Sequence, residues 1–393
     1  MYLNLTFPII SIILFAVALL CGVLVWIILH LRVRSVVTAR YRADNLSPAD
    51  KPEEYSPASV VIYSQGDPDN LLELLRMVLH QDYPAPYEVV VVNEGESAEI
   101  RDTVGMLRSS NPNLYLTFTP EGVVNLSRKK LALTLGIKAA RYGIVVLTTT
   151  AARVESDQWL RRMVRPFSNP EVEVVLGAAY VHADEDTASG FRRRAFDNVA
   201  TTIRWVGAAL AGHPFRGTEF NIAYRKELFL RHKGFARSLN LHYGDDDLFV
   251  SQIATGSNTA VELSAESVVR VVQGNHPRLF RENIVRRFFT ESFIKSRPRI
   301  VFPAMAWLQI CLLGCSVAGA ILSWPNVLGI IIAFVLIAAM SVLDIVYWRG
   351  AMKSFEARKL CLTLPFLAAT RPLRQLSARL GASVSKQKKY TWD

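Results

Sequence analysis

The sequence predicts a doubly wound α/β domain with a mostly parallel sheet, joined to about three transmembrane helices and to helices at the membrane interface. Short valine-rich runs alternate with helical segments through the middle of the chain, a pattern typical of parallel strands buried on both faces. Uncharged apolar stretches flank this middle region, and their lengths fall in the range of roughly 17 to 25 residues that a membrane span needs.

The apolar stretches cover residues 7–29, 301–324 and 327–343. Buried core helices are the alternative, but helices so long and so uniformly apolar are rare in small soluble domains. No Lys or Arg precedes the first stretch and no small-residue cleavage site follows it. We therefore expect the first stretch to be an uncleaved anchor and not a signal peptide.

Basic residues adjoin one end of each apolar stretch. They are Arg32, Arg34, Arg40 and Arg42 after the first, Arg287, Lys295, Arg297 and Arg299 before the second, and Arg349, Lys353, Arg358 and Lys359 after the third. Positive residues mark the cytoplasmic ends of membrane spans. We therefore expect an integral protein of the inner (cytoplasmic) membrane, with its middle domain and its C-terminal tail in the cytoplasm.

The net charge of +11 is distributed unevenly along the chain. Residues 1–56 carry +1, residues 57–275 carry −2 and residues 276–393 carry +12. The slightly acidic middle domain argues against a nucleic-acid partner. The basic excess lies beside the spans, where the anionic head groups of a lipid bilayer attract it. None of the four cysteines shows metal-ligand spacing or a disulfide framework.

These observations divide the chain into six segments. They are an anchor (1–31), a cytoplasmic linker (32–56), the α/β domain (57–275), a basic interfacial helix (276–300), a transmembrane hairpin (301–348) and a basic tail with interfacial helices (349–393). In the tail, Arg alternates with Leu and prolines interrupt the apolar runs, which favours short helices lying on the membrane. A tail that packs on the domain is the alternative.

Within the middle domain, valine-rich strands are expected at 59–63, 87–92, 114–118, 144–147 and 173–180, and helices at 70–80, 127–140 and 157–167. Ligands of doubly wound sheets bind beyond the carboxyl ends of the strands. The segments that follow Tyr63, Val92 and Leu147 are therefore the places to look for functional residues.

The ordered segments of the middle domain resemble those of family 2 glycosyltransferases, which have the GT-A fold. The matching segments are 59–63 (SVVIY), 80–84 (HQDYP), 88–95 (EVVVVNEG), 127–133 (SRKKLAL), 156–160 (SDQWL), 221–229 (NIAYRKELF) and 244–249 (GDDDLF). The resemblance implies transfer of a sugar from a nucleotide sugar to a lipid-linked or polysaccharide acceptor at the cytoplasmic face.

The resemblance also assigns nucleotide-binding residues. Asp67 and Glu94 follow the first two strands, where the family carries acidic residues, and Glu94 replaces the usual Asp. The family's metal-binding Asp-x-Asp pair falls on Thr149 and Ala151, neither of which offers an anionic ligand. We therefore expect no metal at the usual place. Mg²⁺ or Mn²⁺ remains possible only at a displaced acidic site, either Glu155 with Asp157 or the cluster at 184–186.

Basic side chains are the alternative means of neutralising a diphosphate. Lys129 and Lys130 stand at the start of the helix expected over 127–140, although a basic helix start near a membrane is the simpler explanation. With Glu94, Asp67 and Thr149 they complete the predicted nucleotide site.

The run Asp245-Asp246-Asp247 is expected to supply the catalytic base, with Asp246 favoured, because adjacent carboxylates raise one another's pKa. An acidic first turn of a helix is the alternative. Arg286 and Arg287 are predicted to contact the acceptor or the membrane interface. The Gln and Trp of the family's Gln-x-x-Arg-Trp pattern are missing here, which argues against processive synthesis.

Two functions therefore stay open. The first is an active membrane glycosyltransferase. The second is a catalytically inactive relative that acts as a scaffold or regulator with partner proteins of envelope polysaccharide assembly, as the loss of the metal ligands at Thr149 and Ala151 suggests.

Overall fold

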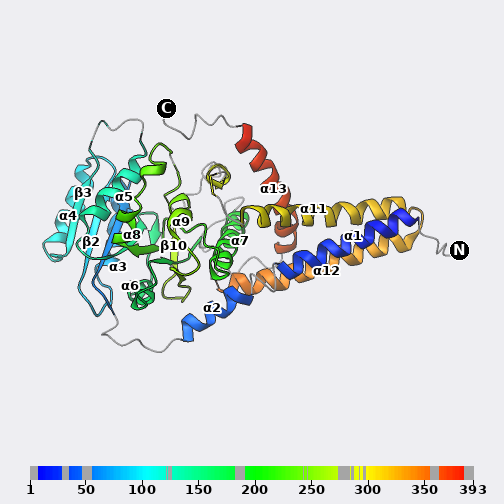
Figure 1. The fold of residues 1–393 in the computed structure, drawn as a ribbon, viewed down its shortest axis with the longest axis horizontal. Helices are drawn as coiled ribbons and strands as arrows, with labels where there is room; N and C mark the ends of the chain where they lie inside the picture. The colour runs from blue at the N-terminus through cyan, green and yellow to red at the C-terminus, as the bar shows by residue number, and fades with distance from the viewer. Residues whose placement is uncertain are drawn as a thin grey trace.

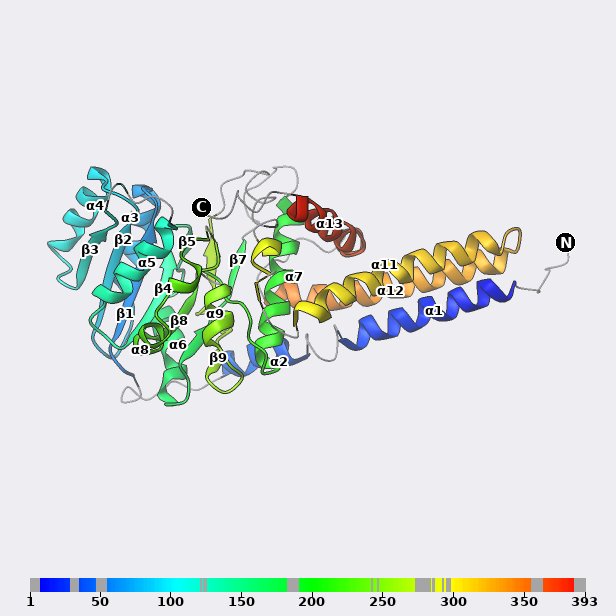
Figure 2. The same ribbon diagram turned by 45° about the horizontal axis from the view of Figure 1, so that its top comes forward.

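The computed structural model places an α/β domain at one end of the molecule and a bundle of long helices at the other (Figure 1). The structure describes residues 8–28, 35–46, 55–120, 122, 126–181, 191–241, 243–245, 247–272, 284, 287–291, 293–294, 298–354 and 363–384. Helices α1, α11 and α12 run beside one another away from the domain in both views (Figures 1 and 2).

The domain is built on a seven-stranded, mostly parallel sheet with the strand order β3-β2-β1-β4-β8-β6-β9. Its strands are β1 (Ala58–Ser64), β2 (Tyr87–Asn93), β3 (Leu114–Phe118), β4 (Ile144–Thr149), β6 (Val174–Leu176), β8 (Ile222–Arg225) and β9 (Thr259–Val261). Strand β8 is antiparallel to both β4 and β6, and the other pairs are parallel. The predicted fold class is therefore confirmed.

One predicted strand was wrong in its extent. The run expected over 173–180 divides into β6 and β7 (Ala179–Val181), and β7 joins a second sheet with the order β5-β10-β7. Strands β5 (Ala152–Arg153) and β10 (Val269–Val271) complete that sheet. The break falls at Gly177, where a Cβ atom would lie only 2.8 Å from the sulfur of Met163 and closer still to Asn221. A long-range contact that the sequence does not reveal thus decides where β6 ends.

Helices cover both faces of the large sheet. They are α3 (Pro68–Val78), α4 (Ala98–Arg108), α5 (Arg128–Ala139), α6 (Trp159–Val164), α8 (Lys226–Arg231) and α9 (Leu248–Ile253). The side chains of Asp67, Ser97 and Ser127 cap α3, α4 and α5 by accepting from backbone N–H groups three residues on. Each cap stabilises its helix by about 1 kcal/mol.

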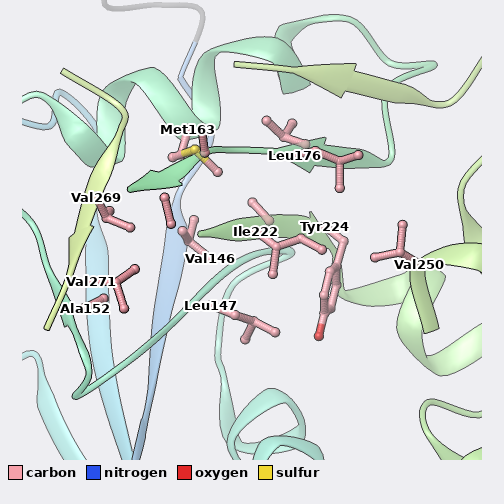
Figure 3. Close-up of a cluster of buried hydrophobic side chains, with 14 of the residues drawn as sticks. Val146, Leu147, Ala152, Met163, Leu176, Ile222, Tyr224, Val250, Val269 and Val271 are labelled. Carbon is pink, nitrogen blue, oxygen red and sulfur yellow. The ribbon is translucent and has the colours of Figure 1, made fainter. Parts of the chain in front are cut away.

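The core lies between the sheet and these helices. Figure 3 shows Val146 and Leu147 of β4 beside Ile222 and Tyr224 of β8, and Met163 of α6 lies in the same cluster. All of these side chains are buried. Burying an aliphatic side chain contributes about 1.5–3 kcal/mol, so this cluster holds the antiparallel half of the sheet against the parallel half.

The long helices are α1 (Ile9–Trp26), α11 (Pro298–Leu322) and α12 (Val327–Ser354). Among the described residues, Ile9–Trp26 and Val327–Trp348 are long and apolar enough to cross a membrane, by length and composition, and the apolar part of α11 is the shorter helix Trp307–Leu322. Three membrane crossings and their orientation stay a prediction.

Three further helices connect the domain to this bundle. They are α2 (Ser35–Leu46), α7 (Phe191–Leu210) and α13 (Leu364–Val384). Helix α2 lies within the segment expected to be a linker, and it is attached to the domain because Asp44 accepts a hydrogen bond of 3.0 Å from the Leu263 backbone. Helix α13 is one helix, although prolines were expected to divide it. Pro365 lies in its first turn, where no N–H is needed, but Pro372 lies inside it.

Candidate active site

The carboxyl ends of β1, β2 and β4 form the edge at which the predicted site lies. The strands pair in parallel, and Tyr63 is in register with both Val92 and Thr149. Side chains that are far apart in the sequence are therefore neighbours at this edge, as the positions of the expected strands predicted.

Lys129 is the centre of a charged cluster at this edge. Its ammonium group, at the start of α5, contacts the carboxylate of Glu219 and lies 2.5 Å from Oδ2 of Asp245. It also lies 5.6 Å from the centre of the Tyr63 ring, within the range of a cation–π contact. The Tyr63 hydroxyl in turn donates to the Glu94 carboxylate. Five separate segments of the chain thus contribute to one cluster of an ammonium, an aromatic ring and three carboxylates.

Lys130, the next residue, points away from this cluster and into the protein. Its side chain is fully buried, and its ammonium donates to the backbone oxygens of Ser238 (2.5 Å), Leu241 (3.2 Å) and Tyr243 (2.7 Å) and to the Ser238 hydroxyl. The Ser127 N–H also donates to the Leu239 carbonyl. The start of α5 therefore holds the loop that leads to the acidic run.

The three aspartates of the acidic run have different surroundings. Asp245 is buried and belongs to the Lys129 cluster. Asp246, favoured as the base, lies outside the described residues. Asp247 caps α9 by accepting from the Leu248 N–H at 2.7 Å, and its other oxygen accepts from Arg216 at 3.0 Å and from the Thr290 hydroxyl. Gly244 begins the run with a φ of 103°, a backbone conformation that only glycine adopts readily.

The acidic run also affects a buried phenol. Burial, and after it the negative charge of Asp245, raise the pKa of Tyr224 well above its usual value. Tyr224, which pairs with Val145 near the amino end of β4, therefore stays neutral.

Asp67 and Thr149 lie at the strand ends where they were expected. One Asp67 oxygen caps α3 by accepting from the Asn70 N–H at 3.0 Å, and the Thr149 hydroxyl accepts from the Ala151 N–H at 3.3 Å. The buried Arg153 side chain connects these turns by donating to the Thr150 carbonyl, to Asn70 and to Glu73. Whether Asp67 or Thr149 contacts a nucleotide stays a prediction.

The described residues do not fit a divalent metal ion. Neither Thr149 nor Ala151 supplies a carboxylate, and no group of three His, Cys, Asp or Glu side chains in the described parts of the chain could hold a metal. The Glu155 carboxylate is taken up by the Tyr180 hydroxyl at 2.8 Å and by Arg270 at 2.9 Å. The alternative cluster at 184–186 lies outside the described residues. The ammonium of Lys129, by contrast, places a fixed positive charge among the carboxylates.

Comparison with known proteins is consistent with this geometry. A family model described as glycosyl transferase family 21 matches residues 11–384, which is nearly the whole chain. The chain belongs to glycosyl transferase family 21. The glycosyltransferase resemblance is therefore confirmed, although the matching family is family 21 and not family 2.

One solved structure supports the same fold for this family 21 chain. The mannosyltransferase PcManGT from Pyrobaculum calidifontis, in complex with GDP-Man and Mn²⁺, aligns with a TM-score of 0.53 and 19% identity, over 95% of this chain and all of that one. TarS 1–349 from S. aureus, in complex with UDP-GlcNAc, has a TM-score of 0.41 and 14% identity, covering 86% and 93% of the two chains. A comparison with curated protein sequences gave no match.

Sequence reasoning missed Tyr63 and Glu219 as members of the cluster. Tyr63 had a usable signal, because it is an aromatic residue at the carboxyl end of the first strand. Glu219 had none, because it lies in an irregular segment before β8 and reaches Lys129 only through the fold. Arg287 donates to the Thr201 hydroxyl at 2.7 Å, and Arg286 lies outside the described residues.

Proposed function

We propose that this family 21 chain transfers a sugar from a nucleotide donor to a lipid-linked or polysaccharide acceptor at the cytoplasmic face of the inner membrane. The observation that carries the proposal is the Lys129 cluster at the carboxyl edge of the sheet. It combines a fixed cation, held by Glu219 and Asp245, with an acidic loop from which a proton acceptor can come. Edges of this kind bind ligands in doubly wound folds.

Lys129 is the residue we assign to the leaving diphosphate. An ammonium group has three N–H donors, and the two carboxylates account for two of them. The third can reach a phosphate oxygen as negative charge develops there. Lys130 has a different role in this proposal, because its buried ammonium holds the 238–243 loop.

The chemical step needs an acceptor hydroxyl, a base and a leaving group. The hydroxyl oxygen bonds to the anomeric carbon, the bond from that carbon to the diphosphate oxygen breaks, and the hydroxyl proton passes to a carboxylate. We assign the proton acceptor to residues 245–247. Asp247 is poorly suited to this role, because its oxygens already cap α9 and pair with Arg216.

The membrane location belongs to the same proposal. The exposed side chains of α1 and α12 include long runs of Ile, Leu, Val and Phe, which favours lipid around them. Protease treatment of sealed inside-out and right-side-out vesicles tests the orientation. We expect the α/β domain to be cleaved only in inside-out vesicles, and cleavage in right-side-out vesicles contradicts the assigned face.

One observation favours the second function, an inactive scaffold. Two carboxylates, Glu219 and Asp245, pair with the ammonium of Lys129, and a third, Glu94, lies at the hydroxyl of the adjacent Tyr63. This excess of negative charge opposes the binding of a bare diphosphate. The loss of the metal ligands at Thr149 and Ala151 points the same way. In that case the chain would act through partner proteins of envelope assembly.

The deciding experiment measures transfer and hydrolysis from a panel of nucleotide sugars, with Mn²⁺ and with a chelator. Lys129→Met and Asp245→Asn are the test variants, and Lys138→Met, an exposed lysine of the same helix, is the matched control. We expect turnover that Lys138→Met keeps and that the two test variants lose by at least about a hundredfold. A folded wild-type protein that turns over no donor refutes the enzyme. Calorimetry with nucleoside diphosphates then shows whether the scaffold still binds them.

A further inference from the structure

Two arginines from distant parts of the chain, the buried Arg371 and the half-buried Arg287, meet at one hydroxyl group on α7. Arg371 of α13 donates to the Thr201 hydroxyl at 3.4 Å, and Arg287 donates to the same oxygen at 2.7 Å. Arg371 is also paired with Asp197, one turn earlier on α7, at 3.1 Å. The Thr201 hydroxyl donates in turn to the Asp197 carbonyl at 2.6 Å. Thr201 is therefore a joint between α13 and the segment 287–291.

The segment 287–291 connects Thr201 to Asp247 of the acidic run. The Arg287 carbonyl accepts from Arg216 at 3.5 Å, and Arg216 also pairs with Asp247 at 3.0 Å. Thr290, one turn after Arg287, donates its hydroxyl hydrogen bond to the same Asp247 carboxylate. If the segment 287–291 moves relative to α7, it therefore displaces Thr290 and the carbonyl that holds Arg216, and Thr290 and Arg216 both donate to Asp247. Asp247 lies two residues from Asp245 of the Lys129 cluster.

The other end of this connection presents an apolar surface. Phe366, Leu373 and Leu380 of α13 repeat every seven residues, so they share one face of the helix, and each is more than half exposed, at 70%, 54% and 59%. Helix α13 contacts α11 and α12 and crosses them at the end nearest the domain (Figures 1 and 2). If α11 and α12 stand in a bilayer, helix α13 lies at the level of its surface. A lipid surface is the occupant that continues from the apolar hairpin onto α13.

We propose that lipid contact on the Phe366, Leu373 and Leu380 face of α13 sets the position of the acidic loop through Arg371, Thr201 and Arg287. This coupling between α13 and the acidic run rests on the membrane location proposed above, but not on catalytic activity. In it, Thr201 is a positioning residue and not a catalytic one. Loss of its hydroxyl disconnects the loop from α13 without touching the loop.

Hydrogen exchange of the full chain in lipid nanodiscs tests the proposal without any substrate. The readouts are the N–H groups of Leu248 and Ser251, which donate to Asp247. Thr201→Val should speed their exchange about threefold to tenfold, because it removes the partly buried hydrogen bond that joins Arg287 to α7. Thr103→Val is the matched control, because Thr103 of α4 also donates to the carbonyl four residues earlier but lies outside the connection.

A second pair of variants tests the lipid end. Leu373→Asp should also speed exchange at Leu248, whereas Leu230→Asp, an exposed leucine of α8, should not. When Thr201→Val is already present, Leu373→Asp should raise the exchange rate at Leu248 little further, because the effects of coupled sites are not additive. The same variants in a lipid-free amphipol should show no effect of Leu373→Asp.

Three results overturn the proposal. They are full additivity of Leu373→Asp and Thr201→Val, equal effects of Thr201→Val and Thr103→Val, and an undiminished effect of Leu373→Asp in amphipol. The last result would point to another occupant of the α13 face, such as a second copy of the chain. Because exchange needs no turnover, a nanodisc protein that lacks transferase activity leaves the outcome readable.

Discussion

Replacing Lys130 by methionine should destabilise the α/β domain strongly, although the two side chains have similar shapes. The substitution removes the Lys130 donor from the buried carbonyls of Ser238 and Leu241 and from the partly buried carbonyl of Tyr243. Each buried acceptor that loses its donor costs about 1–3 kcal/mol. The variant also no longer pays the desolvation cost of a buried ammonium, which offsets several kcal/mol of that sum. The net loss should be about 2–4 kcal/mol.

Urea denaturation in detergent, followed by tryptophan fluorescence to which the buried Trp159 of the domain contributes, measures this loss. In a domain of this size, the same change lowers Tm by very roughly 5–15 °C. Lys138→Met, in the same helix but exposed, should stay within about 0.5 kcal/mol of wild type. If the two variants unfold at the same urea concentration, Lys130 does not hold the loop and the reasoning fails.

Three further predictions concern the frame around the site. Gly136→Ala should lower the free energy of unfolding in urea by about 1–3 kcal/mol, because a Cβ would lie 2.7 Å from Val61 and closer to Val92. The control Gly105→Ala, with open space around it, should raise the free energy of unfolding by about 0.5–1 kcal/mol. An equal rise in both variants contradicts the close packing of α5. Asn221→Ala removes partners from Trp159, Ala178 and Ser267, so a loss of about 3–5 kcal/mol in urea is expected, and a loss below about 1 kcal/mol counts against it. Burial first, and the charge of Glu262 second, raise the pKa of Asp44 above its ordinary 3.8. A carboxyl with a raised pKa in the folded state stabilises the fold below its ordinary pKa, and this contribution is lost as the pH rises through the folded-state pKa. The free energy of unfolding should therefore decline from acid to neutral pH, and Asp44→Asn should flatten the decline whereas the exposed Asp69→Asn should keep it.

Much of the fold could be predicted because its signals are local. Valine-rich strands buried on both faces read as continuous apolar runs, and the strand ends after Tyr63, Val92 and Leu147 marked the edge where the charged cluster lies. The absence of carboxylates at Thr149 and Ala151 is also a property of the sequence itself. Helix α4 and the division of 173–180 between two sheets were missed, since the packing of Gly177 against Asn221 decides the latter.

Neighbouring charges in the sequence were separated only by the tertiary structure. Lys129 and Lys130 appear equivalent as letters, but successive residues of a helix point about 100° apart, so one faces the ligand edge and the other is buried under the 238–243 loop. Asp245 and Asp247 were likewise indistinguishable. One pairs with Lys129, and the other caps α9 and pairs with Arg216.

The sequence by itself determined the α/β class, the glycosyltransferase resemblance, the apolar segments and the missing metal ligands, because each of these depends on residue type and local spacing. Only the tertiary structure decided which charges meet. The partners of Lys129 and of Arg371 come from segments about a hundred or more residues away, and those pairs form only once the strands and helices have packed.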